Sequence, residues 1–369
     1  MYNRIAVLNN YPLSRVWKEV ELGETPDHLL FGINYFTSAG FDCKFVPSDD
    51  SAKVPLLYRL LKKLYFLQEL GHLGQQSYII NNKHNYDLIY APCSGQTEWL
   101  QYLRYQGKFD LPIISLRHHH LAKGHLEIFR NRFRRNVCHG LDASPCLSQF
   151  VANDLTEKTG VQAKAIHWGT DIDFYQPEVN PGEGLVVAGR TARDFSTVIR
   201  ALSGSSIKAK ILFLDGHLGY EGETPKNLQL LSSPEVQPVP GKNEGWRKVR
   251  DILDIYRKAR VIGIPLYKQS TLAGLTSLMD CLGMGKPVIM TRNPNLDLDI
   301  EKEGIGYWVN AEDVESWRKH LDWFDRNPEE AVKMGKRARS LAVNYYNSKR
   351  FAEEMISIFN ESCTPKQSS

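Results

Sequence analysis

The chain has 369 residues, more than one ordinary hydrophobic core accommodates, and this favours two domains or one large α/β unit. Its hydrophobic fraction of 42% is typical of a globular protein, and no apolar run reaches the roughly 18 residues of a membrane-spanning helix. A net charge of +4 is too small to indicate a nucleic-acid-binding protein, and six scattered cysteines without a CxxC pair indicate neither a disulfide framework nor a zinc site.

Strand-like and helix-like segments alternate in the first half. Residues 4–10 (RIAVLNN) form the first predicted strand, and residues 26–40 are predicted to form one helix ending at Gly40. Further strands are predicted at residues 41–47, 86–92, 111–117 and 141–148. Strands separated by helical stretches imply parallel βαβ units. The start of the chain lacks the apolar stretch of a secretory signal, so we expect a cytoplasmic protein.

A stretch rich in Pro and Gly, EVNPGEG, separates this series from a second one. We therefore predict an N-terminal domain at residues 1–176, a linker at 177–184 and a C-terminal domain at 185–345. Strands of the second series are predicted at residues 185–190, 209–216, 260–266 and 286–291, with helices at 196–204 and 249–259. Ligands of doubly wound sheets bind at the carboxyl ends of strands, which makes the cleft between two such domains the expected site.

The stretch STLAGLTSLMDCLGMGKPVI, residues 270–289, places hydroxyls and a glycine where a helix should begin. A helix start carries unpaired N–H groups and a partial positive charge, so it favours phosphate. Ser270, Thr271 and Thr276 can donate hydrogen bonds, and Gly274 allows an oxygen to approach the backbone. Asp280 lies one to two turns further on, where its carboxylate can accept hydrogen bonds from a ribose diol. The alternative is a capped helix in which Asp280 makes an ordinary polar contact.

The segment GLTSLMDCLGMGKPVI resembles the nucleotide-binding helix of retaining GT-B glycosyltransferases, in the large family that includes sucrose synthases and phosphatidylinositol mannosyltransferases. Asp280 falls on the ribose-binding Glu of that family, whereas the earlier Glu of its paired motif has no match. Residues 141–177, 185–202 and 249–266 are similar to further family segments in the same order. The resemblance implies an α/β protein of the GT-B type, with two doubly wound Rossmann-like domains facing across a cleft, the first binding the acceptor and the second the nucleotide sugar. It also implies that a C-terminal helix at about residues 346–362 packs back on the first domain.

The resemblance also assigns residue roles. Arg190 matches the arginine that neutralises the diphosphate, and Arg193 replaces an absent second cation, although either can instead be a solvated surface arginine. His118 matches a histidine that faces the donor sugar, with His119 as the alternative register. Gly23 and His28 fall on a loop that approaches the donor. The expected donor-binding set is Arg190, Arg193, Ser270, Thr271, Gly274, Leu275, Thr276 and Asp280. Members of this fold generally need no metal, so no metal ligand and no cofactor besides the donor substrate is expected.

Two segments of the first half combine basic and apolar residues. The first, at residues 53–71, contains Arg59, Lys62 and Lys63. The second, at residues 129–137, contains Arg130, Arg132, Arg134 and Arg135. A basic amphipathic helix can lie on an anionic membrane surface, which adds a peripheral location at the inner face of the membrane as an alternative. The other reading is a core-facing helix with a solvated charged face, and nucleic acid is the least favoured partner.

The prediction is therefore a hexosyltransferase that moves a sugar from a nucleoside-diphosphate sugar to an acceptor hydroxyl, with retention and without metal. The acceptor is expected to be a glycan, a lipid or a small molecule. Two alternatives remain open at this stage. One is a non-catalytic subunit that binds a sugar nucleotide, supported by the missing Glu, and the other is a sugar-nucleotide epimerase of the same fold.

Overall fold

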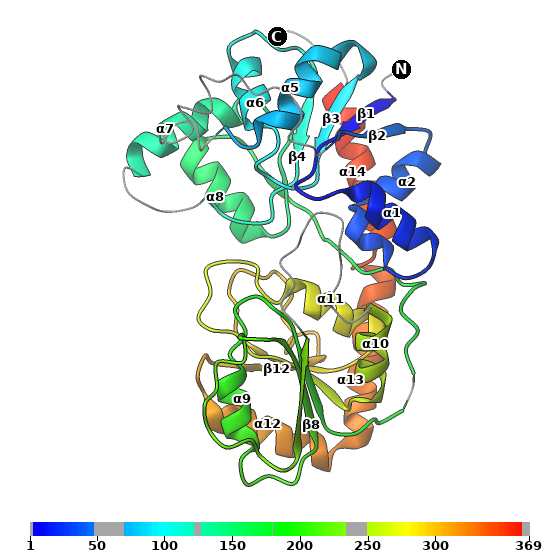
Figure 1. Cartoon of the computed structure of the whole chain (residues 1–369), viewed down its shortest axis with the longest axis vertical. Coiled ribbons are helices and arrows are strands. Elements are labelled where there is room, and N and C mark those ends of the chain that lie inside the picture. Colours follow the sequence, from blue (N-terminus) through cyan, green and yellow to red (C-terminus); the bar gives the residue numbers. More distant parts are fainter. Residues whose placement is uncertain (1–2, 48–69, 122–126, 179, 234–248, 364–369) are drawn as a thin grey trace. The chain divides into compact units, whose positions relative to one another are not determined.

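The computed structural model describes residues 3–47, 70–121, 127–178, 180–233 and 249–363. The chain divides into two compact units, and Figure 1 follows it through both. Unit 1 takes residues 1–18, 30–168 and 349–369, and unit 2 takes residues 19–29 and 169–348. The division thus falls at Trp168 instead of at residue 176, and a short N-terminal loop belongs to the second unit.

Unit 1 contains a parallel four-stranded sheet with the order β2-β1-β3-β4. Its strands are β1 (Arg4–Val7), β2 (Asp42–Phe45), β3 (Leu88–Ala91) and β4 (Ile113–Ser115). The predicted strand at 141–148 is reduced to β5 (Pro145–Cys146), which pairs in parallel with β6 (Lys164–Ala165). The strand order reverses between β1 and β3, as in other doubly wound sheets.

Helices flank the strands of unit 1. Those within its described residues are α1 (Leu13–Glu21), α2 (Ile33–Ser38), α5 (Leu73–Asn82), α6 (Glu98–Tyr105), α7 (Glu127–Cys138), α8 (Gln149–Thr159) and α14 (Ser348–Cys363), with 3-10 turns at Asp27–Leu30 and Lys83–Asn85. Helix α1 runs across the boundary between the two units.

Helices pack on both faces of this sheet, as adjacent residues of β3 show. Ile89 belongs to a buried cluster with Ile79 of α5 and Leu100 of α6. Tyr90 points to the other face because side chains of a strand alternate. Its ring lies 5.4 Å from that of Phe359, which in turn lies 4.9 Å from that of Phe36. Helix α14, drawn in red in Figure 1, therefore packs on unit 1, which is where the resemblance placed it.

The helix predicted at residues 26–40 is wrong as a single element. The chain forms the 3-10 turn Asp27–Leu30, breaks, and resumes as α2. Phe31 and Gly32 have positive φ values of 50° and 85° at the break. A Cβ on Gly32 would lie 2.8 Å from the ring of Phe36, so both backbone geometry and space require glycine there.

Unit 2 contains a parallel six-stranded sheet with the order β12-β11-β10-β7-β8-β9. Its strands are β7 (Leu185–Ala188), β8 (Ala209–Leu214), β9 (Leu228–Ser233), β10 (Val261–Ile264), β11 (Val288–Thr291) and β12 (Gly306–Val309). The two edge strands, β9 and β12, were not among the predicted ones. All residues of β7, β10 and β11 are buried, as expected for central parallel strands covered on both faces.

The helices of unit 2 are α9 (Phe195–Leu202), α10 (Val249–Lys258), α11 (Leu275–Met284), α12 (Val314–Arg326) and α13 (Pro328–Asn344). Val187 of β7 shares a buried cluster with Phe195 of α9 and Trp317 of α12. Asp194 caps α9 by accepting a hydrogen bond from the backbone N–H of Thr197 at 3.1 Å. The sheet and these helices form the core that carries the candidate site.

The predicted linker is folded against unit 2. The N–H of Glu183 donates to the carbonyl of Lys258 at 2.9 Å, and Arg260 Nη2 donates to the carbonyl of Gly182 at 3.3 Å. A Cβ on Gly182 would lie 2.2 Å from the carbonyl oxygen of Ala259. The glycines of EVNPGEG therefore allow close packing of the backbone, besides marking the change from one series of elements to the next.

Candidate functional site

Helix α11 begins where the hydroxyl-rich stretch predicted it. Gly274 precedes the helix with φ of 91°, and a Cβ there would lie 2.6 Å from Met290 Cε. Ser270 and Thr276 are exposed, whereas Thr271, Gly274 and Leu275 are half-buried. Because the loop follows β10 (Figure 1), the helix start lies at the carboxyl end of the sheet of unit 2. This geometry leaves a helix N-terminus with hydroxyl groups accessible to an anion.

Two buried asparagines after β11 hold this loop in place. Asn293 Nδ2 donates to the carbonyls of Thr271 at 2.9 Å and of Ala273 at 3.0 Å. Asn295 Nδ2 donates to the carbonyl of Thr271 at 3.1 Å and to Asn293 Oδ1 at 2.9 Å. The sequence reasoning missed both residues. The sequence could have identified them, because they are polar residues directly after a buried strand of a parallel sheet, where ligands bind.

Arg190 and Arg193 follow β7 and differ in their surroundings. Arg190 is exposed. Arg193 is buried, and it donates to the carbonyl of Ala188 at 3.2 Å and to Ser277 Oγ at 2.7 Å. A Cβ on Gly189 would lie 2.2 Å from Arg193 Nε, so glycine is needed for the guanidinium to lie on the backbone. Arg193 thus ties the loop after β7 to the first turn of α11, whereas Arg190 presents an accessible cation.

Asp280 is half-buried and is held by Tyr175, whose hydroxyl donates to Asp280 Oδ1 at 2.5 Å. Burial raises the pKa of Asp280 to about 6, while the hydrogen bond from Tyr175 and the charge of Arg193 act in the opposite direction. A Cβ on Gly283 would lie 2.7 Å from Tyr175 Cγ, so this glycine makes room for the ring. Tyr175 was missed as a site residue, although it lies in the segment FYQP that supported the family resemblance.

The loop with Gly23 and His28 belongs to the same unit. Gly23, with φ of 65°, accepts a hydrogen bond from Arg250 Nε at 2.6 Å. The ring of His28 stacks on that of Tyr175 with centroids 6.1 Å apart. Burial lowers the pKa of His28 to about 4, so the imidazole is neutral at physiological pH. His28, Tyr175 and Asp280 therefore form one cluster, which we call the Asp280 cluster, from three distant parts of the chain.

His118 lies in unit 1, just after β4. Its Nε2 is 2.7 Å from the carbonyl oxygen of Pro92 and donates to it, which leaves Nδ1 as the acceptor nitrogen. Burial lowers the pKa of His118 to about 4, and its ring lies 5.3 Å from that of Phe31. His119 is exposed, and partial desolvation together with the neighbouring His120 lowers its pKa. No three His, Cys, Asp or Glu side chains within the described ranges gather closely enough to hold a metal ion.

The basic segments are only partly described. Arg59, Lys62 and Lys63 lie outside the described residues. On α7, Arg132 and Arg135 are exposed and Arg130 is half-buried. Arg134 is buried, with 7% of its surface exposed, and its Nη1 lies 3.4 Å from Asn131 Oδ1. Within the described part of the chain, no helix has the length and apolar character needed to cross a membrane.

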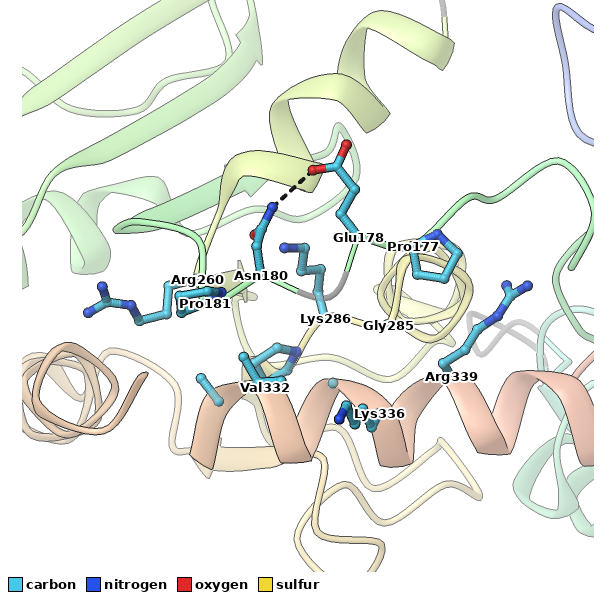
Figure 2. A pocket seen from close by; sticks show the side chains of 13 residues that line it. Pro177, Glu178, Asn180, Pro181, Arg260, Gly285, Lys286, Val332, Lys336 and Arg339 are labelled. Atoms are coloured by element: carbon cyan, nitrogen blue, oxygen red, sulfur yellow. Dashed lines mark hydrogen bonds between the residues drawn. The ribbon is translucent and has the colours of Figure 1, made fainter. Parts of the chain in front are cut away.

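A small pocket of about 140 Å³ lies near the other end of α11 (Figure 2). Glu178 and Asn180 of the predicted linker line it together with Lys336 and Arg339 of α13. Lys286 is buried, and its Nζ donates to the carbonyls of Arg257 at 2.6 Å and Ala259 at 2.9 Å. The lysine of the segment GKP therefore caps the carboxyl end of α10. Its role is structural, and it lies beyond the opposite end of α11 from the hydroxyl-rich helix start.

No protein-family model matches the chain. A D-inositol 3-phosphate glycosyltransferase of Saccharomonospora viridis is 27% identical to it over 112 residues. This match covers 30% of the chain and only 25% of the length of that relative.

Solved structures resemble the chain over almost its whole length. A glycosyltransferase from Rickettsia africae superposes with a TM-score of 0.66 and 14% identity over 99% of both chains. A sucrose-phosphate synthase from Thermosynechococcus elongatus gives a TM-score of 0.65 and 15% identity over 97% of this chain and 98% of its own. The Anabaena protein HepE, solved in complex with UDP, gives a TM-score of 0.63 and 14% identity over 98% of this chain and 100% of its own. These likenesses confirm the predicted GT-B fold.

Proposed function

We propose that this protein is a glycosyltransferase that moves a sugar from a nucleoside-diphosphate sugar to an acceptor hydroxyl. The observation that carries the proposal is the arrangement in unit 2 at the start of α11. An accessible helix N-terminus, the exposed Arg190 and the half-buried Asp280 offer complementary groups to a diphosphate and to a ribose diol. The Anabaena neighbour, which was solved with UDP and with UDP and glucose, supports the same ligand class.

Tyr175 and Asp280, the start of α11 and the two arginines after β7 have separate roles in this proposal. Tyr175 donates to Oδ1 of Asp280, which orients the carboxylate so that Oδ2 can accept from the diol. The N–H groups at the start of α11 and the hydroxyls of Ser270 and Thr276 would bind the diphosphate. Arg190 would balance the charge that develops on the leaving diphosphate. Arg193 would act indirectly, because its hydrogen bonds position Ser277 and the loop before it.

In the transfer step, the bond between the anomeric carbon and the diphosphate oxygen breaks, and the diphosphate leaves with the electron pair. A new bond forms between that carbon and the acceptor oxygen, whose proton passes to the departing diphosphate oxygen. The neutral His118 would accept a hydrogen bond from a sugar hydroxyl at Nδ1, because its Nε2 is already used by the carbonyl of Pro92. Retention and independence of metal are parts of the proposal, and the resemblance of residues 274–289 to retaining enzymes supports them.

The position of Arg134 counts against a lipid or glycan acceptor at a membrane surface. The inward position of Arg134 removes one of the four arginines of α7 from the expected basic face. A non-catalytic sugar-nucleotide-binding subunit is the second candidate, because Ser270 and the buried Leu272 occupy the region of the missing Glu. A sugar-nucleotide epimerase is a third, without a structural observation that favours it.

The test is a calorimetric screen of the purified chain against UDP, GDP, ADP and their sugars, without added metal. We expect micromolar binding of one diphosphate class, weakened in Asp280→Asn and unchanged in the matched control Asp322→Asn on α12. Arg190→Ala should weaken binding, whereas Arg326→Ala, which removes an exposed arginine at the end of α12, should not. Binding with neither transfer nor hydrolysis of the sugar would favour the non-catalytic subunit. Absence of binding to every nucleotide would refute the proposal.

A further inference from the structure

A second cavity, with a volume of about 570 Å³, opens in unit 1 at the carboxyl ends of β1 and β2. Its size is within the usual range for pockets that bind small molecules. Val7 of β1 and residues that follow it line one side, residues of β2 and the two that follow line another, and Gln75 of α5 completes the cavity. The carboxyl ends of parallel strands are where doubly wound sheets bind their ligands. None of the residues expected at the donor site lines this cavity.

Two buried amide side chains of the cavity wall carry an oxygen without a hydrogen-bond partner in the part of the chain that the structure describes. They are Asn9 Oδ1 and Gln75 Oε1, on residues that are 4% and 5% exposed. Leaving such an acceptor unsatisfied is unfavourable, so buried polar atoms nearly always have partners. Two of them on one cavity wall indicate a ligand that supplies hydrogen-bond donors.

The orientation of both amides is determined by their nitrogens. Asn9 Nδ2 donates to the carbonyl of Tyr11 at 3.2 Å, and Gln75 Nε2 donates to the carbonyl of Val46 at 3.0 Å. Rotating either amide by 180° would place its oxygen against the carbonyl oxygen that its nitrogen now contacts, which is unfavourable. The side-chain oxygens are therefore the atoms that lack a partner.

The cavity wall is close to neutral. Among its described residues Lys44 is the one cation, and its Nζ pairs with Asp42 Oδ1 at 2.8 Å. Burial raises the pKa of the Cys43 thiol to about 12 and also raises the pKa of Tyr11, so both are uncharged at neutral pH. The half-buried Phe45 adds an apolar surface against which the C–H groups of a sugar ring can pack.

We infer that this cavity binds the acceptor, and that the acceptor is an unphosphorylated, hydroxyl-rich molecule such as a hexose or a polyol. Two of its hydroxyls donate to Asn9 Oδ1 and Gln75 Oε1, and another hydroxyl receives the transferred sugar and passes its proton to the departing diphosphate oxygen. The inference rests on the proposed function. An anionic acceptor is disfavoured because the two unpaired oxygens carry partial negative charge and Lys44 is already paired with a carboxylate.

The experiment measures direct binding, so that its outcome does not depend on transfer activity. Saturation-transfer NMR on the full chain would use glucose, fructose, mannose and myo-inositol, together with glucose 6-phosphate and fructose 6-phosphate. The variants are Asn9→Leu and Gln75→Leu, which remove the oxygens. The matched control is Gln101→Leu, because Gln101 is also a buried amide with an unpaired Oε1 but lies outside the cavity. Thermal unfolding of each variant establishes that it is folded.

We expect at least one neutral probe to bind, each variant to weaken that binding about tenfold, and the control to leave it unchanged. In the transfer assay the same variants should raise the acceptor KM without changing the donor KM or the slow hydrolysis of the donor. Binding of sugar phosphates alone, of no probe at all, or equal binding by the wild type and both cavity variants would overturn the inference. A failure of nucleotide binding would instead refute the proposed function, since sugar binding in this cavity is measured without a nucleotide.

Discussion

The protonation of Asp280 should control how tightly the protein binds its donor. Its pKa is raised to about 6 by burial, and only the ionised carboxylate accepts hydrogen bonds through both oxygens. Because a raised pKa favours the protonated form below pH 6, donor affinity should be highest above that value and fall as the pH decreases. The pKa of His28 is about 4, so this neighbour stays mostly neutral between pH 5 and pH 7. The pKa values of Tyr175, Tyr256 and Cys281 are raised by burial well above that range.

The size of the effect follows from the titration of one group. With a pKa of about 6, the carboxylate is roughly nine-tenths ionised at pH 7 and one-tenth ionised at pH 5, so donor affinity should differ about tenfold between them. Tyr175→Phe removes a hydrogen bond to the charged form, which should raise the pKa of Asp280 by about one unit. In this variant the midpoint of the loss of affinity should therefore lie near pH 7, about one unit higher than in the wild type.

The assay is calorimetric titration with the nucleotide sugar at pH 5, 6, 7 and 8. The nucleotide sugar is used because the terminal phosphate of a free nucleoside diphosphate itself titrates near pH 6, as phosphate monoesters do. Asp280→Asn should bind weakly and with no dependence on pH over this range. An affinity that stays constant from pH 5 to pH 7 in the wild type would refute the reasoning. A tenfold decrease in donor affinity from pH 7 to pH 5 that persists in Asp280→Asn would refute it as well.

Three further predictions concern the surrounding residues. Gly274→Ala should lower the free energy of unfolding by about 1–3 kcal/mol in urea titrations, because φ is 91° and the new Cβ would meet Met290 Cε. Arg193→Ala should destabilise the protein by about 3 kcal/mol, whereas Arg190→Ala should weaken donor binding about tenfold without changing the melting temperature. The kcat–pH profile of His118→Gln should run parallel to that of the wild type between pH 5 and pH 8, because the pKa of His118 is about 4; a wild-type step near pH 6.5 that the variant lacks would contradict this.

Local patterns in the sequence were sufficient to predict most of the framework. Apolar strands alternating with helices predicted parallel βαβ units, and the glycine and hydroxyl residues before Leu275 predicted where α11 begins. These features depend on backbone preferences and on burial that repeats within a few residues. The prediction of one helix at 26–40 was wrong because local preferences alone do not show where a helix breaks. A single glycine inside a helical pattern is often tolerated, and only the approach of the Phe36 ring to Gly32 shows that this one breaks the helix.

The chemistry of the candidate sites depends on contacts between distant residues. Tyr175 lies 105 positions before Asp280, and no local pattern shows that its hydroxyl holds one carboxylate oxygen. The sequence did not distinguish the surroundings of Arg193 from those of Arg190. Only the packed structure shows that Arg193 is buried and hydrogen-bonded, whereas Arg190 is exposed. The unpaired oxygens of Asn9 and Gln75 became visible only when β1 and α5 were placed beside the same cavity. Backbone preferences act between near neighbours, whereas hydrogen bonding, charge and burial at a site are set by whichever segments the packed core brings together.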